Sequence, residues 1–86
     1  MKIVAKPIEV LAVFSATGEI RPYRFRISSD PHMQTIRVDR IVHVEEKKVA
    51  GISAIHFDCR SQMDEQEIMY QLRYQTEDQR WILFKI

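Results

Sequence analysis

The segment TIRVDRIVHVE, residues 35–45, decides the fold because its apolar side chains alternate and then change phase. Four apolar residues of this segment share one parity: Ile36, Val38, Val42 and Val44. Arg40 occupies a position of the same parity, and Ile41 breaks the alternation. A bend or bulge near residues 39–41 resolves this conflict. Small barrels turn their corners through long bent strands, so the segment predicts a barrel-like sheet.

Alternation continues on both sides of this segment and indicates further strands. Candidate strands cover residues 8–14, 22–27, 54–60 and 81–86. Hairpin turns are expected at residues 16–19, where Gly18 supplies a positive φ, and at Ala50–Gly51. Residues 28–31 contain Pro31 and predict a further turn or loop. In the second strand two faces are expected, one with Tyr23, Phe25 and Ile27 and the other with Pro22, Arg24 and Arg26.

Residues 61–76 allow two interpretations. Helix-forming residues near Gln62–Gln66 favour a helix around 63–76, which would make the fold α+β. Alternation of Ile68, Tyr70, Leu72 and Tyr74 with polar residues favours a strand. We adopt the strand, so residues 1–86 form one all-β domain of about six antiparallel strands in a bent meander or small barrel.

Composition narrows the class of protein. The chain has 86 residues, a formal net charge of +1 and a single cysteine, so a disulfide-stapled scaffold is excluded. No apolar run reaches the length of a membrane span, and the first 15 residues lack the pattern of a signal peptide. We therefore expect a soluble, cytoplasmic domain with no membrane partner.

His43 and His56 flank the hairpin at Ala50–Gly51. A turn at residues 49–50 would pair the two histidines, whereas a turn at residues 50–51 would pair His43 with Asp58 and His56 with Glu45. Imidazole and carboxylate groups can bind zinc, so a small metal-binding or enzymatic protein using His43 and His56 is one alternative. A solvated polar pair is the interpretation that we favour. Cys59 has the parity of the apolar residues, which predicts a buried structural thiol.

Motifs for catalysis are absent from the sequence. There is no triad order, no glycine-rich phosphate loop and no paired-carboxylate motif. The expectation is therefore a protein that is not an enzyme and has no cofactor and no metal.

Arginines supply the candidate binding residues. Arg24 and Arg26 share a strand face, and Arg21, Arg37 and Arg40 would lie nearby if the second and third strands pair. Guanidinium groups bind phosphate and stack on bases, so a nucleic-acid or nucleotide surface is predicted, with Arg24, Arg26, Arg37 and Arg40 as its candidate contacts. The nearly neutral net charge instead favours a mixed, solubilising surface.

The segment from Trp81 to Phe84 is apolar on both faces of its expected strand. Such a strand is either central in the core of the chain or part of an interface. Trp81 and Phe84 are therefore candidate contacts of a homodimer.

The whole chain resembles a family of short bacterial proteins of unknown function. Five segments carry the resemblance: Met1–Val10, Pro22–Ile27, Ile36–Ile41, the hairpin at Ala50–Gly51 and Trp81–Ile86. Trp81–Leu83 and Ile36–Ile41 also resemble strands of WYL modules, which are Sm-like barrels of bacterial regulators. That resemblance implies contacts of Arg37 and Arg40 with a nucleotide or nucleic acid. The sequence as a whole predicts a non-catalytic binding or interaction module, with self-association into a homodimer as one expected property.

Overall fold

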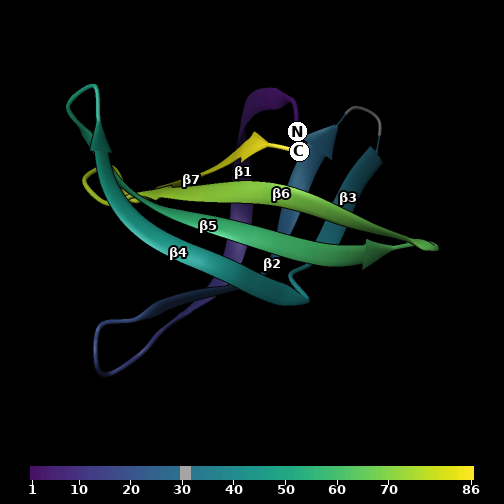
Figure 1. Ribbon diagram of the computed structural model, residues 1–86, viewed down its shortest axis with the longest axis horizontal. Helices are drawn as coiled ribbons and strands as arrows, with labels where there is room; N and C mark the ends of the chain where they lie inside the picture. The colour runs from purple at the N-terminus through teal and green to yellow at the C-terminus, as the bar shows by residue number, and fades with distance from the viewer. Residues whose placement is uncertain (30–31) are drawn as a thin grey trace.

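Seven antiparallel strands make up the part of the chain that the computed structural model describes, residues 1–29 and 32–86 (Figure 1). The strands are β1 (Ile3–Phe14), β2 (Ile20–Ser29), β3 (His32–Arg37), β4 (Arg40–Val49), β5 (Ile52–Met63), β6 (Gln66–Gln75) and β7 (Arg80–Lys85). They form one sheet in the order β3-β2-β1-β7-β6-β5-β4. The sheet curls into a half-barrel, which confirms the all-β prediction.

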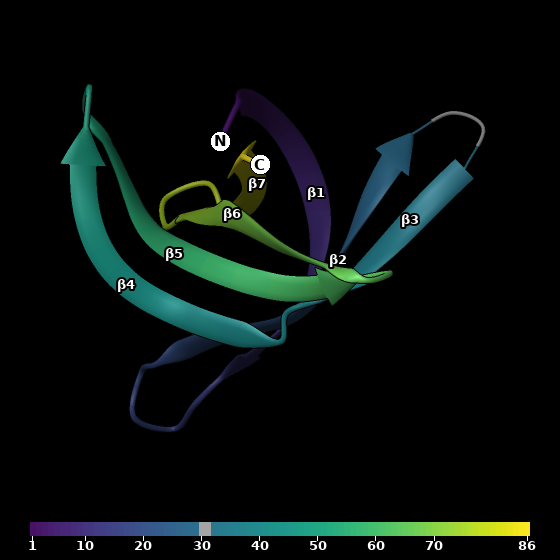
Figure 2. The same ribbon diagram turned by 45° about the vertical axis from the view of Figure 1, so that its right-hand side comes forward.

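Strand β1 joins two parts of the curled sheet. Its C-terminal half pairs with β2, and its N-terminal half pairs with β7. As a result β3 and β4 lie at opposite ends of the strand order, although only Val38 and Asp39 separate them in the chain. The view in Figure 2 shows β4 and β5 bending together around β6 and β7.

The long strand expected over residues 35–45 is divided into two strands. β3 ends at Arg37 and β4 begins at Arg40, and the register of β4 against β5 shifts between Ile41 and His43. The predicted bend is therefore confirmed at its predicted place. The sheet has one strand more than expected because the chain changes partner there, from β2 to β5.

Residues 63–76 contain no helix. β5 and β6 form a hairpin around Asp64, which has a φ of 54°, and Tyr70 and Leu72 on β6 are fully buried. The α+β alternative is wrong because apolar alternation outweighs local helix propensity where a core face is available. The turn predicted at residues 28–31 lies partly outside the described residues, and Ser28 and Ser29 belong to β2.

The core lies on one face of the sheet. Its fully buried side chains include Phe25, Phe57, Cys59, Leu72 and Leu83. The burial of Cys59, with 2% of its surface exposed, confirms the predicted structural thiol. Burial raises the pKa of this thiol to about 12, and the nearby charge of Asp58 adds to the effect.

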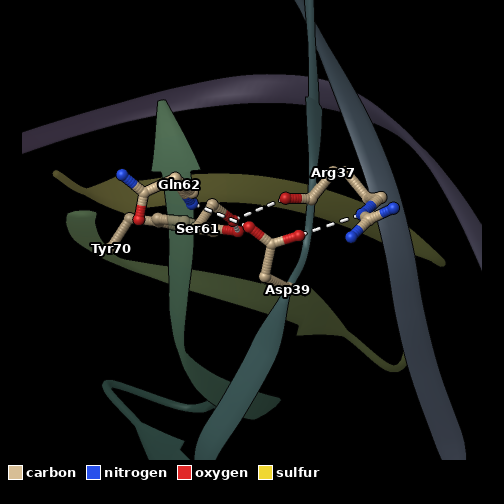
Figure 3. Close-up of polar contacts among 5 residues, drawn as sticks. All are labelled: Arg37, Asp39, Ser61, Gln62 and Tyr70. Atoms are coloured by element: carbon tan, nitrogen blue, oxygen red, sulfur yellow. Dashed lines mark hydrogen bonds and ion pairs between the residues drawn. The ribbon is translucent and has the colours of Figure 1, made fainter. Parts of the chain in front are cut away.

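Polar contacts fasten the corner between β3 and β4 to the end of β5 (Figure 3). The Asp39 carboxylate accepts hydrogen bonds from the backbone N–H of Gln62 at 2.7 Å and from Arg37 Nε at 2.9 Å. These two bonds lower the pKa of Asp39, the Gln62 bond more strongly. The Ser61 hydroxyl donates to the carbonyl of Arg37, and the Tyr70 hydroxyl contacts Ser61. This corner therefore links β3, at one end of the strand order, to β5, the strand next to the other end.

Candidate functional site: an arginine face on strands β1 to β3

Three of the four predicted arginines project from one face of the sheet. Arg26 lies opposite Glu9, and Arg24 lies opposite Leu11 on one side and Arg37 on the other. Directly opposite residues of neighbouring antiparallel strands have their side chains on the same face. Arg24, Arg26 and Arg37 are all solvent-exposed, so this face is open to a ligand.

A bulge in β2 adds two residues to this surface. The register shifts between Leu11 and Ala12, so that Tyr23 is an extra residue and Arg21 lies opposite Val13. The predicted faces of β2 are wrong at this point, because Pro22 is buried and Tyr23 is 44% exposed. We call this surface the arginine face and define it by Arg21, Tyr23, Arg24, Arg26 and Arg37.

The electrostatics of the arginine face leave part of its charge uncompensated. Arg26 forms an ion pair with Glu9, and Arg37 Nε lies 2.9 Å from an oxygen of Asp39. Within residues 1–29 and 32–86, Arg24 forms no ion pair, and it lies directly opposite Arg37. Like charges directly opposite each other destabilise a sheet. An anion bound between these two guanidinium groups would relieve that repulsion.

Two shallow hollows flank Arg24 on this face. One has a volume of about 340 Å³ and extends along Arg26. The other has a volume of about 390 Å³ and is lined by Tyr23 and Arg37. Arg21 stacks on Tyr23, with the guanidinium carbon 5.4 Å from the ring centroid. Cationic and apolar groups therefore alternate along the same open surface.

Arg40 does not join this face. It begins β4 and lies opposite Arg60 of β5. The corner at residues 38–39 moves the chain from β2 to β5, so Arg40 projects from a different pair of strands than Arg37 does. The structure therefore brings together three of the four predicted arginines.

The histidines follow the second of the two predicted registers. Ala50 and Gly51 form the turn, His43 lies opposite Asp58, and His56 lies opposite Glu45. His56 is only 6% exposed, so the expected solvated pair is wrong for this residue. β5 is an inner strand, so His56 has a cross-strand neighbour on each side, Glu45 of β4 and Arg73 of β6. Among the described residues, no group of three or more metal-ligating side chains converges.

Trp81 and Phe84, the predicted interface residues, lie on an inner strand. β7 is hydrogen-bonded to β1 on one side and to β6 on the other. The Trp81 ring lies 4.9 Å from the Tyr74 ring and 5.5 Å from the Phe57 ring, measured between centroids. Phe84 lies under the guanidinium of Arg73. Both rings have contacts within the chain, and their contact with a second copy stays a prediction.

Sequence reasoning missed Tyr23 as a member of the face, and it placed Arg21 only in the neighbourhood of Arg24 and Arg26. A bulge shifts the alternation by one residue, and an ideal strand pattern does not show where it occurs. A signal was present in the spacing of Arg21, Arg24 and Arg26, since three arginines on one face of a strand require an extra residue between the first two.

Comparisons of the chain with protein-family models, with curated proteins and with solved structures found no match. No helix long and apolar enough to cross a lipid bilayer occurs among the residues described.

Proposed function

We propose that this chain is a non-catalytic binding module whose arginine face binds single-stranded nucleic acid. The observation that carries the proposal is the bulge at Tyr23, which puts three arginines of β2 on the same face as Arg37. Guanidinium groups make paired hydrogen bonds to phosphate oxygens. The face therefore offers a row of phosphate contacts along two neighbouring strands.

The exposed apolar groups of this face support a strand with accessible bases. Tyr23 is 44% exposed and Leu11 is 56% exposed, and both line the hollow beside Arg24. Proteins that bind single strands combine a cationic track with aromatic side chains on which bases stack. A duplex is read by an element that enters its groove, and the open surface of a sheet suits an unpaired strand better.

The net charge of +1 concerns the whole chain, whereas binding depends on the local distribution. On and beside the arginine face, four arginines oppose the two carboxylates of Glu9 and Asp39. This excess of positive charge supports binding of a polyanion at low and moderate ionic strength.

The remaining expectations belong to the same proposal. A bacterial, cytoplasmic setting is proposed from the resemblance to short bacterial proteins, and the resemblance to WYL modules is a separate reason to propose a nucleic-acid ligand. Self-association would use the faces of Trp81 and Phe84, because β7 is an inner strand and has no free edge.

Fluorescence anisotropy with labelled single-stranded DNA and RNA tests the proposal. We expect binding that weakens with salt, and we expect Arg24→Gln and Arg37→Gln each to lower the slope of log K against log salt by about 1 or less. Arg80→Gln removes the same charge from an exposed position on β7 and serves as the matched control.

Three results would contradict the proposal. One is an absence of anisotropy change at low salt. Another is equal weakening by Arg80→Gln and Arg24→Gln, which would indicate nonspecific attraction. The third is tighter binding of duplex than of single strand.

A further inference from the structure

A second candidate site lies on the face of the sheet opposite the core, away from the arginine face. A groove of about 250 Å³ runs over β5, β6 and β7 and ends at the tip of the β4–β5 hairpin. We call it the polar groove and define it by Ala54, His56, Arg73, Gln75, Ile82 and Phe84. Figure 2 shows how the bend of β4 and β5 raises their hairpin at one end of this concave side.

Arg73 is held in one orientation at the centre of the groove. Its Nε donates a hydrogen bond of 2.8 Å to Gln71, whose amide donates one of 2.9 Å to Asp58. The guanidinium carbon lies 3.2 Å from the centroid of the Phe84 ring. Stacking and the single Nε bond fix the plane of the guanidinium before any ligand arrives, and such preorganisation lowers the entropic cost of binding.

The two terminal nitrogens of Arg73 are free to bind a ligand. Within the described part of the chain, neither nitrogen has a protein acceptor, and Arg73 forms no ion pair. Burial lowers the pKa of Arg73, an effect that the charge of Asp58 opposes. An arginine still keeps its proton at neutral pH. The groove therefore presents a fixed positive charge with two parallel N–H donors.

His56 lies beside Arg73 and is the second polar group of the groove. The two residues are cross-strand partners, and His56 is 94% buried, the complement of its 6% exposure. Its imidazole forms no hydrogen bond with a described residue, and its ring nitrogens are not among the fully buried polar atoms that lack a partner. The ring nitrogens therefore keep access to the groove that His56 lines, where a water molecule or a ligand atom can form a hydrogen bond with them.

The surrounding charges favour a neutral imidazole. Burial lowers the pKa of His56, and the positive charges of Arg73 and Lys47 lower it further, while Glu45 and Asp58 act in the opposite direction. A neutral imidazole donates one hydrogen bond. The groove thus offers one fixed charge and one neutral donor.

We propose that the polar groove binds a small organic monocarboxylate with an apolar tail. Both carboxylate oxygens accept hydrogen bonds from the terminal nitrogens of Arg73, and one of them also accepts from His56. The tail lies against Ile82 and Ala54, which line the groove beside these polar groups. A guanidinium matches the planar, two-oxygen shape of a carboxylate. The nearby carboxylates of Glu45 and Asp58 disfavour a doubly charged phosphate.

A titration with benzoate tests this site, with benzamide as the neutral analogue of similar shape. We expect benzoate to raise the unfolding temperature and to shift the NMR signals of Arg73 Nε–H and the His56 ring. Benzamide should bind at least tenfold more weakly, since it lacks the charge that pairs with the guanidinium. Inorganic phosphate should also bind more weakly than benzoate.

Two substitutions and one control separate this site from the rest of the surface. Arg73→Lys keeps the charge but loses the paired donors, so we expect about tenfold weaker benzoate binding. His56→Leu removes one donor and should weaken binding about fivefold. Arg24 belongs to the arginine face and does not line the polar groove, so Arg24→Gln should leave benzoate binding unchanged. Circular dichroism of each variant verifies the fold before titration.

Several results would overturn the proposal. They are equal binding of benzoate and benzamide, unchanged binding by Arg73→Lys, tighter binding of phosphate, and shifts confined to β1–β3. Absence of any response up to about 20 mM benzoate, above the millimolar Kd of weak ligands, would overturn it as well. The proposal does not depend on the arginine face, so nucleic-acid binding and benzoate binding can fail independently.

Discussion

The Asp39 carboxylate accepts the backbone N–H of Gln62 at 2.7 Å, and this contact holds the β3–β4 corner against the end of β5. The contact lowers the pKa of Asp39 below its ordinary value of 3.8. A carboxylate with a lowered pKa in the folded state stabilises the fold above its ordinary pKa. That contribution is lost as the pH falls through the lower, folded-state pKa.

Asp39→Asn should therefore remove part of the acid sensitivity of this protein. Urea unfolding measured from pH 7 to pH 2.5 should show lower stability of the variant at neutral pH and a smaller loss below pH about 4. Glu65→Gln, at an exposed position of the β5–β6 turn, is the control. Parallel pH profiles of Asp39→Asn and the wild type would contradict the role given to the corner.

The buried hydroxyls behind this corner predict unequal effects of two substitutions. Ser61 donates its single proton to the Arg37 carbonyl, so the Tyr70 hydroxyl must donate to Ser61. Tyr70→Phe removes only the last bond and should cost about 1 kcal/mol. Ser61→Ala leaves two buried groups without a partner and should cost about 2–4 kcal/mol. Urea unfolding measures both, and a larger cost for Tyr70→Phe would reverse the proposed direction of donation.

The hairpin turn at Ala50–Gly51 predicts a stabilising substitution. Both residues have positive φ, 51° and 81°, as a type I′ turn requires. Asparagine tolerates this conformation better than alanine, so Ala50→Asn should stabilise the fold by about 0.5–1 kcal/mol. Gly51→Ala should destabilise it by about 1 kcal/mol. Thermal unfolding of both variants tests the turn, and a lower melting temperature for Ala50→Asn would rule it out.

The thiol of Cys59 should be unreactive in the folded protein. Its surface is 2% exposed, and burial raises its pKa to about 12. Because the thiolate is the reactive form, labelling with Ellman's reagent at pH 8 should require unfolding. The labelling rate should increase with urea in proportion to the unfolded fraction. Rapid labelling of the folded protein without urea would show that the thiol is accessible.

Trp81 predicts a large stability effect within a single chain. Its ring contacts Tyr74 and Phe57, so Trp81→Ala should cost about 3 kcal/mol. If these contacts account for its role, the unfolding midpoint of the wild type does not change with protein concentration. A midpoint that rises with concentration would instead place Trp81 in a homodimer, and light scattering would then give twice the mass of 10.2 kDa.

Local sequence patterns predicted most of the strands and the corner between β3 and β4. The conflict between Arg40 and Ile41 is visible in the sequence because both positions belong to one short segment. The turn at Ala50–Gly51 is visible for the same reason, since positive φ favours glycine. These features depend on neighbouring residues alone.

Features that depend on distant residues could not be predicted in this way. The burial of His56 follows from the strands beside β5, and the fixed guanidinium of Arg73 depends on Phe84 of another strand. The apolar character of Ile82 on the second face of β7 was the one signal of this groove. The sequence analysis explained this apolar character by a central strand or an interface. In the structure β7 is an inner strand, and Ile82 lines the polar groove.

The position of β7 has a consequence for the order of folding. Without residues 80–85, the strand order divides into two three-stranded pieces, β3-β2-β1 and β6-β5-β4. In each piece the edge strand that faces β7, β1 in one and β6 in the other, has no partner on that side until β7 pairs with both. Until then, the free edges of β1 and β6 can pair with other chains. Pairing of β7 therefore joins two three-stranded pieces into one continuous sheet.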